Sequence, residues 1–558
     1  MSAQHQRLFD ARQRNAVLDE VDGGDFDLVV VGGGINGAGV AHDAALRGLR
    51  VLLVEQRDFA FGTSSRSSKL IHGGLRYLEH YQFKLVFEGT NERAALRRIA
   101  PHLVRPLMFA LPVYEGDRHP LWLMDVGLWM YDSLSLFKVE KRHITLRSSK
   151  RMLEREPLLN PDGLTGGIIY YDCMTDDARM TLENAIAATE LGSPVLTRAK
   201  VVGVSGLEGD ATPRVAIRDG ITDRLIEVSA RGVVNCTGAW TDKTRSLAQV
   251  EDQIVRPTKG VHIVVEHDRL PCSQASALLA PQDGRVFFAI PWHGRTVLGT
   301  TDTDFEGDPG EIGVTLDDVQ YLLAAANHHF PGQNLTPDDV FATWAGLRPL
   351  IKPDDAASES DVPREHKLYR DGRMVTIAGG KLTTYRRMAA ETVDVAAQVA
   401  DLKVPGSKSA KAKLPGARGL TKDFDALAEE LQKQADLPED VAQRLANVYG
   451  SRAKDVAAYV STDKAMRDRI TPDRDAIFAE VAFAVERELA LSVDDVMVRR
   501  TSLTLTAKDQ GMSAVERVAD VMGERLGWTD AERQASLDEY AHSVALSRGF
   551  RTELEKSA

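Results

Sequence analysis

The sequence predicts an α/β fold with a large antiparallel sheet beside it and a helical domain at the C-terminus. Three observations support this prediction. A strand–helix–strand pattern opens the chain, short β-rich runs alternate with polar turns through about 150–385, and helical spacing dominates after residue 414. A chain of 558 residues is also too long for one compact core, so two or three domains are expected.

Composition and charge exclude several classes of protein. The chain is 43% hydrophobic and 27% charged, and 69 basic against 81 acidic residues give a net charge of −12. A nucleic-acid-binding protein normally has a basic excess, so no nucleic-acid partner is expected. Cys173, Cys236 and Cys272 lie far apart, which suits a reducing compartment and provides neither a disulfide framework nor a metal site.

Neither a targeting segment nor a membrane span is evident. Residues 1–25 form a charged, polar leader and have no apolar run of the kind found in secretory signals. The stretch nearest to a span is Leu121–Phe137, which Asp125 and Asp132 interrupt. A core helix is the favoured interpretation. A helix lying on a membrane surface is the alternative, because two Trp, two Met and a Tyr lie close together.

The first strand–helix–strand unit has the pattern of a Rossmann-type dinucleotide-binding domain. An apolar strand and a helix flank GGGINGAG, in which Gly32, Gly34 and Gly37 form GxGxxG, and the next strand, Val51–Val54, ends at Glu55. The glycines allow a tight turn, close approach of the backbone to a pyrophosphate, and close packing of helix on strand. Glu55 is placed to bind a ribose hydroxyl and would repel a 2′-phosphate, which disfavours NADP.

Two features favour FAD as the dinucleotide. Only one GxGxxG motif is evident, and the chain does not continue as a simple six-stranded NAD domain. The apolar run Gly232–Trp240, much later in the chain, ends in Thr-Gly-Ala at the point where many flavoproteins return a strand to the cofactor. A buried strand with a bulge at Gly238 is the alternative interpretation.

The chain is divided into four regions. They are a leader at 1–25, an FAD-binding domain interleaved with a substrate-binding (cap) domain at 26–400, a linker at 401–413 and a C-terminal helical domain at 414–558. LPGARG marks the last boundary, and Thr529 with Glu532 has the pattern of a helix capping box.

Several polar residues could carry chemistry. The run SSKLIHGGLRYLEHY at 67–81 places basic side chains around a glycine pair, as expected for a segment whose backbone packs closely around a polar, anionic ligand. Arg348 and Arg364 could clamp a phosphate with their planar guanidinium groups, although arginines are usually surface residues. His262, on an apparent strand, is either a general base or an ordinary strand residue. Lys381 follows two glycines and is either a charge near the cofactor or a surface lysine.

Six motifs in the order GGGINGAGVAHDAALRG, SSKLIHGGLRYLEHY, KGVHIVVEH, IPWHGRTVLGTTDTDFEGDP, WAGLRPL and GGKLTTYR carry a family resemblance. From about residue 25 to the C-terminal helices, the chain resembles the FAD-dependent glycerol-3-phosphate dehydrogenases. The resemblance implies that 67–74 lies along the FAD and that the loop containing Lys381 lies on the flavin pyrimidine. Family members more often have Ser or Thr before the second arginine, where this chain has Pro363, so the assignment of Arg364 is the weaker one.

The motifs and the resemblance together predict three sets of site residues. The cofactor-binding set is Gly32, Gly34, Gly37, Glu55, Ser67, Ser68, Lys69, Leu70, Gly73, Gly74, Gly238, Gly380, Lys381, Leu382 and Thr383. The substrate-binding set is Arg76, Tyr77, His262, Arg348 and Arg364. The catalytic set is His262, Arg348, Lys381 and Arg76, and no metal is expected.

The resemblance implies oxidation of sn-glycerol 3-phosphate to dihydroxyacetone phosphate. A base, His262 in the first instance and Lys381 next, takes the C2 hydroxyl proton while a hydride passes from C2 to flavin N5. Arg348 and Arg364 hold the phosphate, and Arg76 and Lys381 supply positive charge near the reacting oxygen. Electrons then go to membrane quinone, which implies peripheral attachment at the inner, cytoplasmic face of the cell membrane, and a homodimer is expected.

Three other functions are weighed against this one. A glycerol-3-phosphate oxidase that uses oxygen shares most of the motifs but usually carries an insertion, for which this chain has no clear room. An amine or amino-acid oxidase needs no phosphate clamp, so Arg348 and Arg364 speak against it. The full set Arg76, His262, Arg348 and Lys381 speaks against a non-catalytic FAD-binding or scaffold protein whose C-terminal helices bind a partner.

Overall fold

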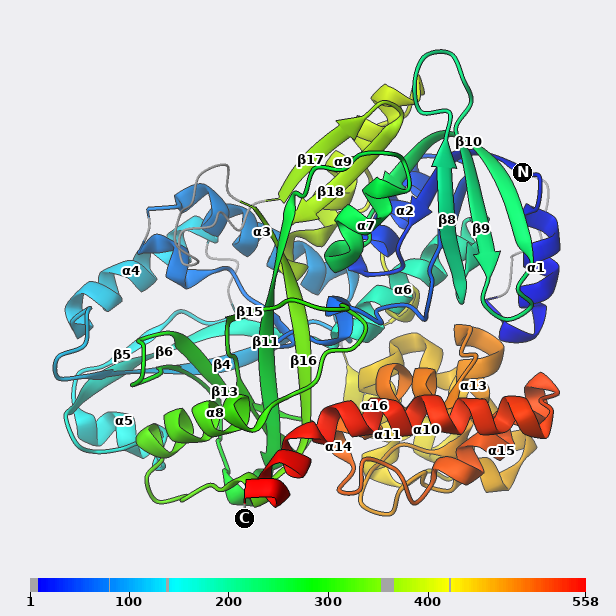
Figure 1. Cartoon of the computed structure of the whole chain (residues 1–558). Coiled ribbons are helices and arrows are strands. Elements are labelled where there is room, and N and C mark those ends of the chain that lie inside the picture. Colours follow the sequence, from blue (N-terminus) through cyan, green and yellow to red (C-terminus); the bar gives the residue numbers. More distant parts are fainter. Residues whose placement is uncertain (1–8, 80, 137–139, 353–365, 421–422, 558) are drawn as a thin grey trace.

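The computed structural model describes residues 9–79, 81–136, 140–352, 366–420 and 423–557, without the side chains of Arg76 and Ser557. Two sheets lie side by side, and in the view of Figure 1 the C-terminal helices lie beneath the first sheet and to the right of the second. In the described residues no helix combines the length and the apolar character needed to cross a membrane.

The first sheet is parallel at its centre. β1 (Asp25–Val31) pairs in parallel with β10 (Leu225–Asn235) and β2 (Val51–Val54), and the described strands run in the order β17-β18-β10-β1-β2-β7. Its other strands are β7 (Val195–Leu196), the β8–β9 hairpin (Ala199–Ser205 and Arg214–Asp219), β17 (His366–Asp371) and β18 (Met374–Gly379). The centre of this sheet, formed by residues 28–31, Val51–Val54 and residues 232–234, is apolar and buried, as expected for parallel strands covered by helices, and the predicted strand–helix–strand unit is confirmed.

The second sheet is antiparallel apart from one parallel pair, β12 with β4. β11 (Val255–Glu266) pairs along its length with β16 (Val340–Ile351) and also with β14 (Arg295–Gly299). The other strands are β3 (Leu70–Ile71), β4 (Arg105–Tyr114), β5 (Ile144–Leu146), β6 (Leu164–Met174), β12 (Ala275–Leu279), β13 (Val286–Trp292) and β15 (Thr303–Asp304).

The boundaries of this sheet differ from the expectation that residues 150–385 form it. The runs VVGVSG, RVAIRDG and GVVNCTG lie in β8, β9 and β10 of the first sheet, whereas β4 joins the second sheet from before residue 150. A β-rich run shows that a strand exists but does not identify its partner, because pairing depends on contacts far apart in the chain. The two sheets are therefore interleaved in the sequence, with β1, β10 and β18 separated by segments of the second sheet.

Helices surround both sheets. Around the sheets they are α1 (Arg14–Val21), α2 (Ile35–Leu46), α3 (Phe83–Ile99), α4 (Leu121–Leu134), α5 (Ser149–Arg155), α6 (Asp177–Glu190), α7 (Thr241–Ser246), α8 (Leu316–His329) and α9 (Tyr385–Val399). The C-terminal helices are α10 (Phe424–Ala435), α11 (Glu439–Tyr449), α12 (Ala453–Thr462), α13 (Phe478–Glu488), α14 (Leu503–Thr506), α15 (Val515–Leu526) and α16 (Asp530–Ser557).

Short helical turns complete the described secondary structure. The 3₁₀ turns are η1 (Ala11–Gln13), η2 (Thr63–Ser65), η3 (Leu75–Leu78), η4 (Gly238–Trp240), η5 (His267–Arg269), η6 (Pro337–Asp339), η8 (Leu382–Thr384), η9 (Pro415–Ala417), η10 (Gly450–Arg452) and η11 (Lys464–Arg467). η12 (Asp495–Arg500) is a π-helical turn. At the start of α16, Thr529 Oγ1 accepts from Glu532 N and the Glu532 carboxylate accepts from Thr529, so the predicted capping box is confirmed.

The interpretation of Leu121–Phe137 as a core helix is wrong for most of α4. Trp122 is 67% exposed, Val126 52% and Trp129 48%, and only Leu128, Tyr131 and Asp132 of this helix are buried. The two aspartates that interrupt the apolar run face the protein, where Asp132 and Asp125 bind the two ring nitrogens of His143 at 2.8 and 3.1 Å. The outward face of α4 is consequently apolar, and Figure 1 shows this helix at the edge of the molecule.

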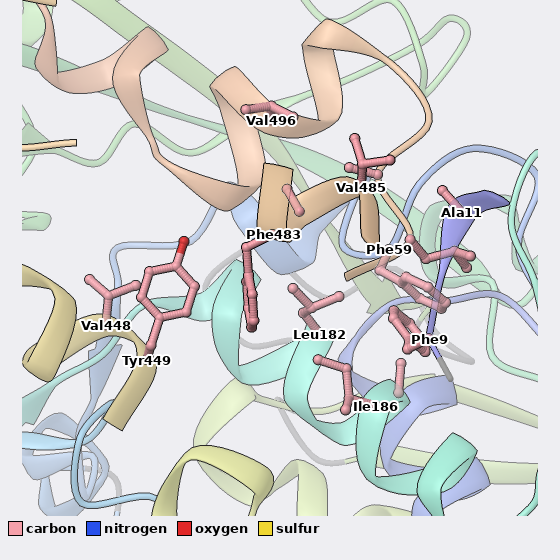
Figure 2. Packing of buried hydrophobic residues seen from close by; sticks show 14 of the residues in the cluster. Phe9, Ala11, Phe59, Leu182, Ile186, Val448, Tyr449, Phe483, Val485 and Val496 are labelled. Carbon is pink, nitrogen blue, oxygen red and sulfur yellow. The ribbon is translucent and has the colours of Figure 1, made fainter. Parts of the chain in front are cut away.

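The C-terminal helices share a core with the first sheet. Figure 2 shows Phe59, from the segment after β2, and Leu182 and Ile186 of α6 in one cluster with Tyr449 and Phe483 from the C-terminal helices. The last helix, α16, reaches the second sheet, where Ser547 and Thr343 of β16 exchange hydrogen bonds of 2.6–3.1 Å. The helical domain is therefore attached to both sheets.

Candidate active site

The turn between β1 and α2 is built to approach a diphosphate closely. Gly32 has a φ of +104°, and a Cβ at Gly37 would clash with the carbonyl of Gly32. α2 begins after Gly34, and the first N–H groups of an α-helix have no acceptor within the helix and carry a partial positive charge. This turn fits the pyrophosphate of FAD, because a side chain at either glycine would fill the space that the turn needs.

Glu55 lies at the end of β2, directly beside that turn. Its Oε2 accepts from Gly33 N at 2.6 Å and its Oε1 accepts from Arg57 N at 2.7 Å. Burial raises its pKa above the ordinary value, against the effect of the two backbone hydrogen bonds. The carboxyl group is thereby fixed in position, as binding of a ribose hydroxyl requires.

The segment from Ser64 to Lys69 runs from the glycine turn toward the second sheet. Ser64 Oγ accepts from Ile35 N at 2.9 Å, and Ser67 donates to Asp177 Oδ2 at 2.7 Å. Lys69 is buried with a φ of +56°, and its Nζ lies 2.7 Å from Asp177 Oδ1. The side chain of Lys69 thus ties the segment to α6.

The Gly73-Gly74 pair sits against α3 and α4. Gly73 N donates to the Tyr131 hydroxyl at 2.9 Å and to Asp172 Oδ1 at 3.2 Å. Gly74 has a φ of +80°, and a side chain there would meet the ring of Tyr77. Both positions need glycine because the backbone packs directly onto Tyr131 and Tyr77. Leu70, earlier in the segment, pairs in β3 opposite Met174.

The second predicted cofactor segment, at the end of β18, meets the first one. Thr383 Oγ1 donates to the carbonyl of His72 at 3.2 Å. Lys381 Nζ lies 3.6 Å from the ring centroid of Tyr77. One pocket is lined by residues of both segments, including His72, Gly73, Gly74, Tyr77, Gly380, Lys381 and Thr383. Leu382 starts η8 beside it, and Gly238, with a φ of +58°, starts η4 after β10.

His262 and Arg348 lie on one face of the second sheet. His262 of β11 is opposite Trp344 of β16, and Arg348 is opposite Thr258, so all four side chains share that face. Glycines give them room. A Cβ at Gly299 would clash with the His262 ring, and a Cβ at Gly260 would clash with the Arg348 guanidinium.

The surroundings of His262 keep the imidazole neutral. Its Nε2 is 2.8 Å from Ser68 Oγ, and its ring stacks on Trp344 with centroids 4.7 Å apart and planes 9° apart. Burial, followed by the charges of Arg348 and Lys69, lowers the pKa of His262 well below 6.5. A buried imidazole beside two cations disfavours its own protonation, so His262 stays neutral to a lower pH than an exposed histidine would.

Arg348 is held in place by the loop after β14. Its Nη1 lies 3.0 Å from Asp302 Oδ1, and its Nη2 donates to Thr300 Oγ1 at 3.0 Å and to Thr301 O at 3.1 Å. The guanidinium is partly exposed on the side-chain face that also carries His262. Such a fixed cation is suited to binding a phosphate.

Two predicted site residues cannot be placed in full. Arg76 lies on η3, between the glycine pair and Tyr77, and its side chain is outside the described part of the chain. Arg364, with Pro363, lies in 353–365 and is outside the described residues altogether.

Sequence reasoning missed the residues that support these groups. Trp344 stacks on His262, Asp302 fixes Arg348, and Asp177 binds both Ser67 and Lys69. Trp344 and Asp302 fall within motifs that were recognised, WAGLRPL and TTDTD, but a motif read along the chain does not show which side chain faces which. Asp177 had no signal beyond its place at the start of a helix.

Two known protein families match the chain. Residues 27–386 match the family described as "FAD dependent oxidoreductase", and residues 407–533 match "C-terminal domain of alpha-glycerophosphate oxidase". The aerobic glycerol-3-phosphate dehydrogenase of Staphylococcus saprophyticus is 35% identical over 535 residues, which cover 94% of this chain and 95% of that protein. The enzyme of the same name from Staphylococcus aureus strain USA300 is 34% identical over 95% of this chain and 96% of that protein.

Solved structures agree with these matches. The glycerol-3-phosphate dehydrogenase of Bacillus halodurans complexed with FAD superposes with a TM-score of 0.81 at 33% identity, covering 97% of this chain and 98% of that one. The L-α-glycerophosphate oxidase of Mycoplasma pneumoniae with FAD bound shares the fold, with a TM-score of 0.53 at 19% identity over 70% of this chain and 98% of that one.

Proposed function

This chain belongs to the family of FAD-dependent glycerol-3-phosphate dehydrogenases, and on that premise we propose that it oxidises sn-glycerol 3-phosphate to dihydroxyacetone phosphate and passes the electrons to membrane quinone. The observation that carries the proposal is the likeness to aerobic dehydrogenases along nearly the whole chain. The cofactor is FAD, which, when bound, supplies the flavin that accepts the hydride. The glycine turn, Glu55 and the two segments around the pocket are the proposed FAD-binding residues.

His262 is the proposed general base. Its place on the sheet face that it shares with Arg348 supports this role, and its lowered pKa leaves the imidazole in the neutral form that can take the C2 hydroxyl proton. The hydrogen bond with Ser68 and the stacking on Trp344 hold the imidazole ring of His262 in one plane, so the ring is oriented before substrate arrives. After proton transfer the imidazolium would lie near Arg348 and Lys69, which favours prompt release of the proton.

Arg348 and Arg364 are the proposed phosphate clamp. The contacts of Arg348 with Asp302 and Thr300 support this role, because a prepositioned guanidinium loses little side-chain entropy on binding. Lys381 and Arg76 are proposed to stabilise negative charge on the reacting oxygen, with Tyr77 in the substrate pocket. The contact between Lys381 and the ring of Tyr77 supports their shared location.

The outward face of α4 is the proposed site of contact with the cytoplasmic face of the membrane. It presents Trp122, Val126 and Trp129 at helical spacing, and the neighbouring helix α3 adds exposed Phe83 and Phe87. Arg142 borders it, with its guanidinium 5.8 Å from the ring centroid of Trp129, and Lys84 of α3 and Lys141, beside Arg142 in the chain, are also exposed. Tryptophan with a basic border is typical of helices that lie at the surface of a bilayer containing anionic lipid.

Oxygen is the second candidate acceptor, favoured by the match of residues 407–533 to a domain named after an oxidase. The homodimer stays a prediction, which analytical ultracentrifugation of the purified protein would test.

The visible spectrum of the purified protein tests the proposed reaction. Glycerol 3-phosphate should bleach the flavin absorbance, and glycerol should do so poorly even at high concentration, because losing a buried charged contact costs about 2–5 kcal/mol. Equal bleaching by glycerol 3-phosphate and by glycerol would contradict the proposed phosphate clamp. No bleaching by glycerol 3-phosphate would contradict its assignment as the substrate. Adding a quinone analogue or air to the bleached enzyme then identifies the acceptor by whichever restores the absorbance faster.

A further inference from the structure

Residues 55–68, which lie in the segment between β2 and β3, are held in place by contacts with the C-terminal helical domain. Asp58 in this segment is buried and accepts three charged hydrogen bonds. Its Oδ2 lies 2.6 Å from Arg499 Nε and 2.7 Å from Arg500 Nη1, and its Oδ1 lies 2.9 Å from Arg500 Nη2. Arg500 therefore grips the carboxylate with both of its terminal nitrogens.

Both arginines come from η12, the π-helical turn of the C-terminal domain. Arg499 Nη2 also binds Asp494 Oδ2 and Asp495 Oδ1, each at 2.8 Å, and Arg500 Nη2 donates to Glu488 O at 2.9 Å. All of these charged side chains are buried. A buried ionic network of this kind adds little net stability over an apolar core, and its best-attested use is to fix one arrangement of two elements. π-turns are frequent at functional sites.

The ion pairs of Asp58 with Arg499 and Arg500, called the Asp58 clamp below, lie between two contacts that the 55–68 segment makes with the nucleotide turn. On one side, Glu55 accepts from Gly33 N. On the other side, Ala60 N donates to Gly33 O at 3.1 Å, and Ser64 Oγ accepts from Ile35 N at the start of α2.

Phe59 and Phe61 make further contacts that hold the 55–68 segment in place. A Cβ at Gly33 would lie 2.9 Å from the ring of Phe59, so this ring packs under the nucleotide turn. Phe61 is surrounded by the guanidinium groups of Arg57, Arg66 and Arg499 at 5.3, 5.4 and 5.8 Å from its ring centroid. A shift of Asp58 would therefore move the carboxylate and hydroxyl that line the turn.

We propose that Asp58, Arg499 and Arg500 are positioning residues for FAD, and that through them the C-terminal helical domain holds the 55–68 segment in its cofactor-binding form. The inference rests on the placement of FAD along this segment proposed above. It assigns to the helical domain a role in cofactor retention that does not require it to touch the cofactor.

The test compares the rate of FAD release from two holoenzyme variants. Asp58→Asn removes the charge from the clamp. Glu480→Gln is the matched control, because Glu480 is an equally buried carboxylate of the C-terminal domain whose hydrogen bonds join Arg444, Tyr449 and Ile477 N, and not the 55–68 segment. FAD fluorescence after dilution measures release, and thermal unfolding measures stability. Asp58→Asn should release FAD roughly ten- to a hundredfold faster, the loss expected for charged hydrogen bonds. Glu480→Gln should lower the unfolding temperature and leave release unchanged.

Release from Asp58→Asn at the wild-type rate would overturn the proposal, as would release that rises in both variants in proportion to their lost stability. If Asp58→Asn does not fold, Arg500→Lys replaces it in the test. Arg500→Lys keeps the positive charge but removes the bidentate contact with Asp58, so FAD release should rise by a smaller factor. Glu55→Gln separates the premise from the inference. If its FAD release is unchanged, the placement of FAD at this segment is wrong. Both results are independent of whether glycerol 3-phosphate is oxidised.

Discussion

His262 and Arg348 place a neutral imidazole and a fixed guanidinium on one face of one sheet. Each depends on its neighbours for that state. His262 is neutral because it is buried beside Arg348 and Lys69, and Arg348 is oriented by Asp302 and Thr300. The glycines beneath both side chains are part of the same arrangement, since any Cβ there would displace them. The two residues should therefore fail in different ways when replaced.

Replacing His262 by Ala should lower kcat by roughly 10²–10⁴, the range for loss of a general base. Replacing Arg348 by Ala should mainly raise KM for glycerol 3-phosphate, because phosphate is bound about equally in the ground and transition states. Steady-state kinetics of the two variants side by side provide the check, each serving as the control for the other.

The pH dependence of kcat/KM is a second test of the role proposed for His262. The pKa of His262 is lowered, so the imidazole stays neutral until the pH falls well below 6.5. The acid limb of kcat/KM in the wild-type enzyme should therefore lie below pH 6.5 and should disappear in His262→Ala. An unchanged kcat and acid limb in that variant would assign the base to another residue, with Lys381 the next to test.

At the level of elements, α4 reverses the usual amphipathic pattern. Its aspartates turn inward to His143, and its tryptophans turn outward. The cost of exposing such a face to water is offset only when something apolar covers it. The basic border favours a lipid surface as that partner.

The double variant Trp122→Ser with Trp129→Ser should lose affinity for vesicles that contain anionic lipid, by about 1–2 kcal/mol for each Trp. Cosedimentation with vesicles measures it, and turnover with a soluble electron acceptor should stay at the wild-type level. Ile221→Ser with Leu225→Ser is the matched control, since these residues are 49% and 58% exposed on the β9–β10 hairpin, far along the chain from α4. Equal loss in both pairs would mean that α4 has no special role.

At the level of the whole molecule, the C-terminal helices do not form an independent body. One buried cluster includes Phe59, Leu182, Tyr449 and Phe483, and the Asp58 clamp and the Ser547–Thr343 hydrogen bonds tie the helices to both sheets. Segments packed into one buried core are expected to open as one cooperative unit.

Thermal or urea unfolding should therefore show one cooperative transition, in which loss of helical circular dichroism and release of FAD coincide. The comparison of the two signals across a denaturant series is the measurement. Two separated transitions, with the helical signal lost first while FAD is retained, would contradict both the shared core and the clamp.

Local pattern determined much of this protein. The spacing of Gly32, Gly34 and Gly37 between an apolar strand and a helix defined the nucleotide turn, because those glycines act through their own backbone. The capping box at Thr529 was readable for the same reason. Motif resemblance pointed to His262 and Arg348, and the pairing of β11 with β16 puts them on a common face.

Only the tertiary structure decided which surfaces meet. It placed three predicted runs in the first sheet, turned the apolar face of α4 outward, lowered the pKa of His262 by burial, and joined Asp58 to arginines more than four hundred residues away. Strand partners, burial and electrostatic environment depend on contacts between distant segments. A sequence pattern reports local preference, and these properties follow from the packing of the whole chain.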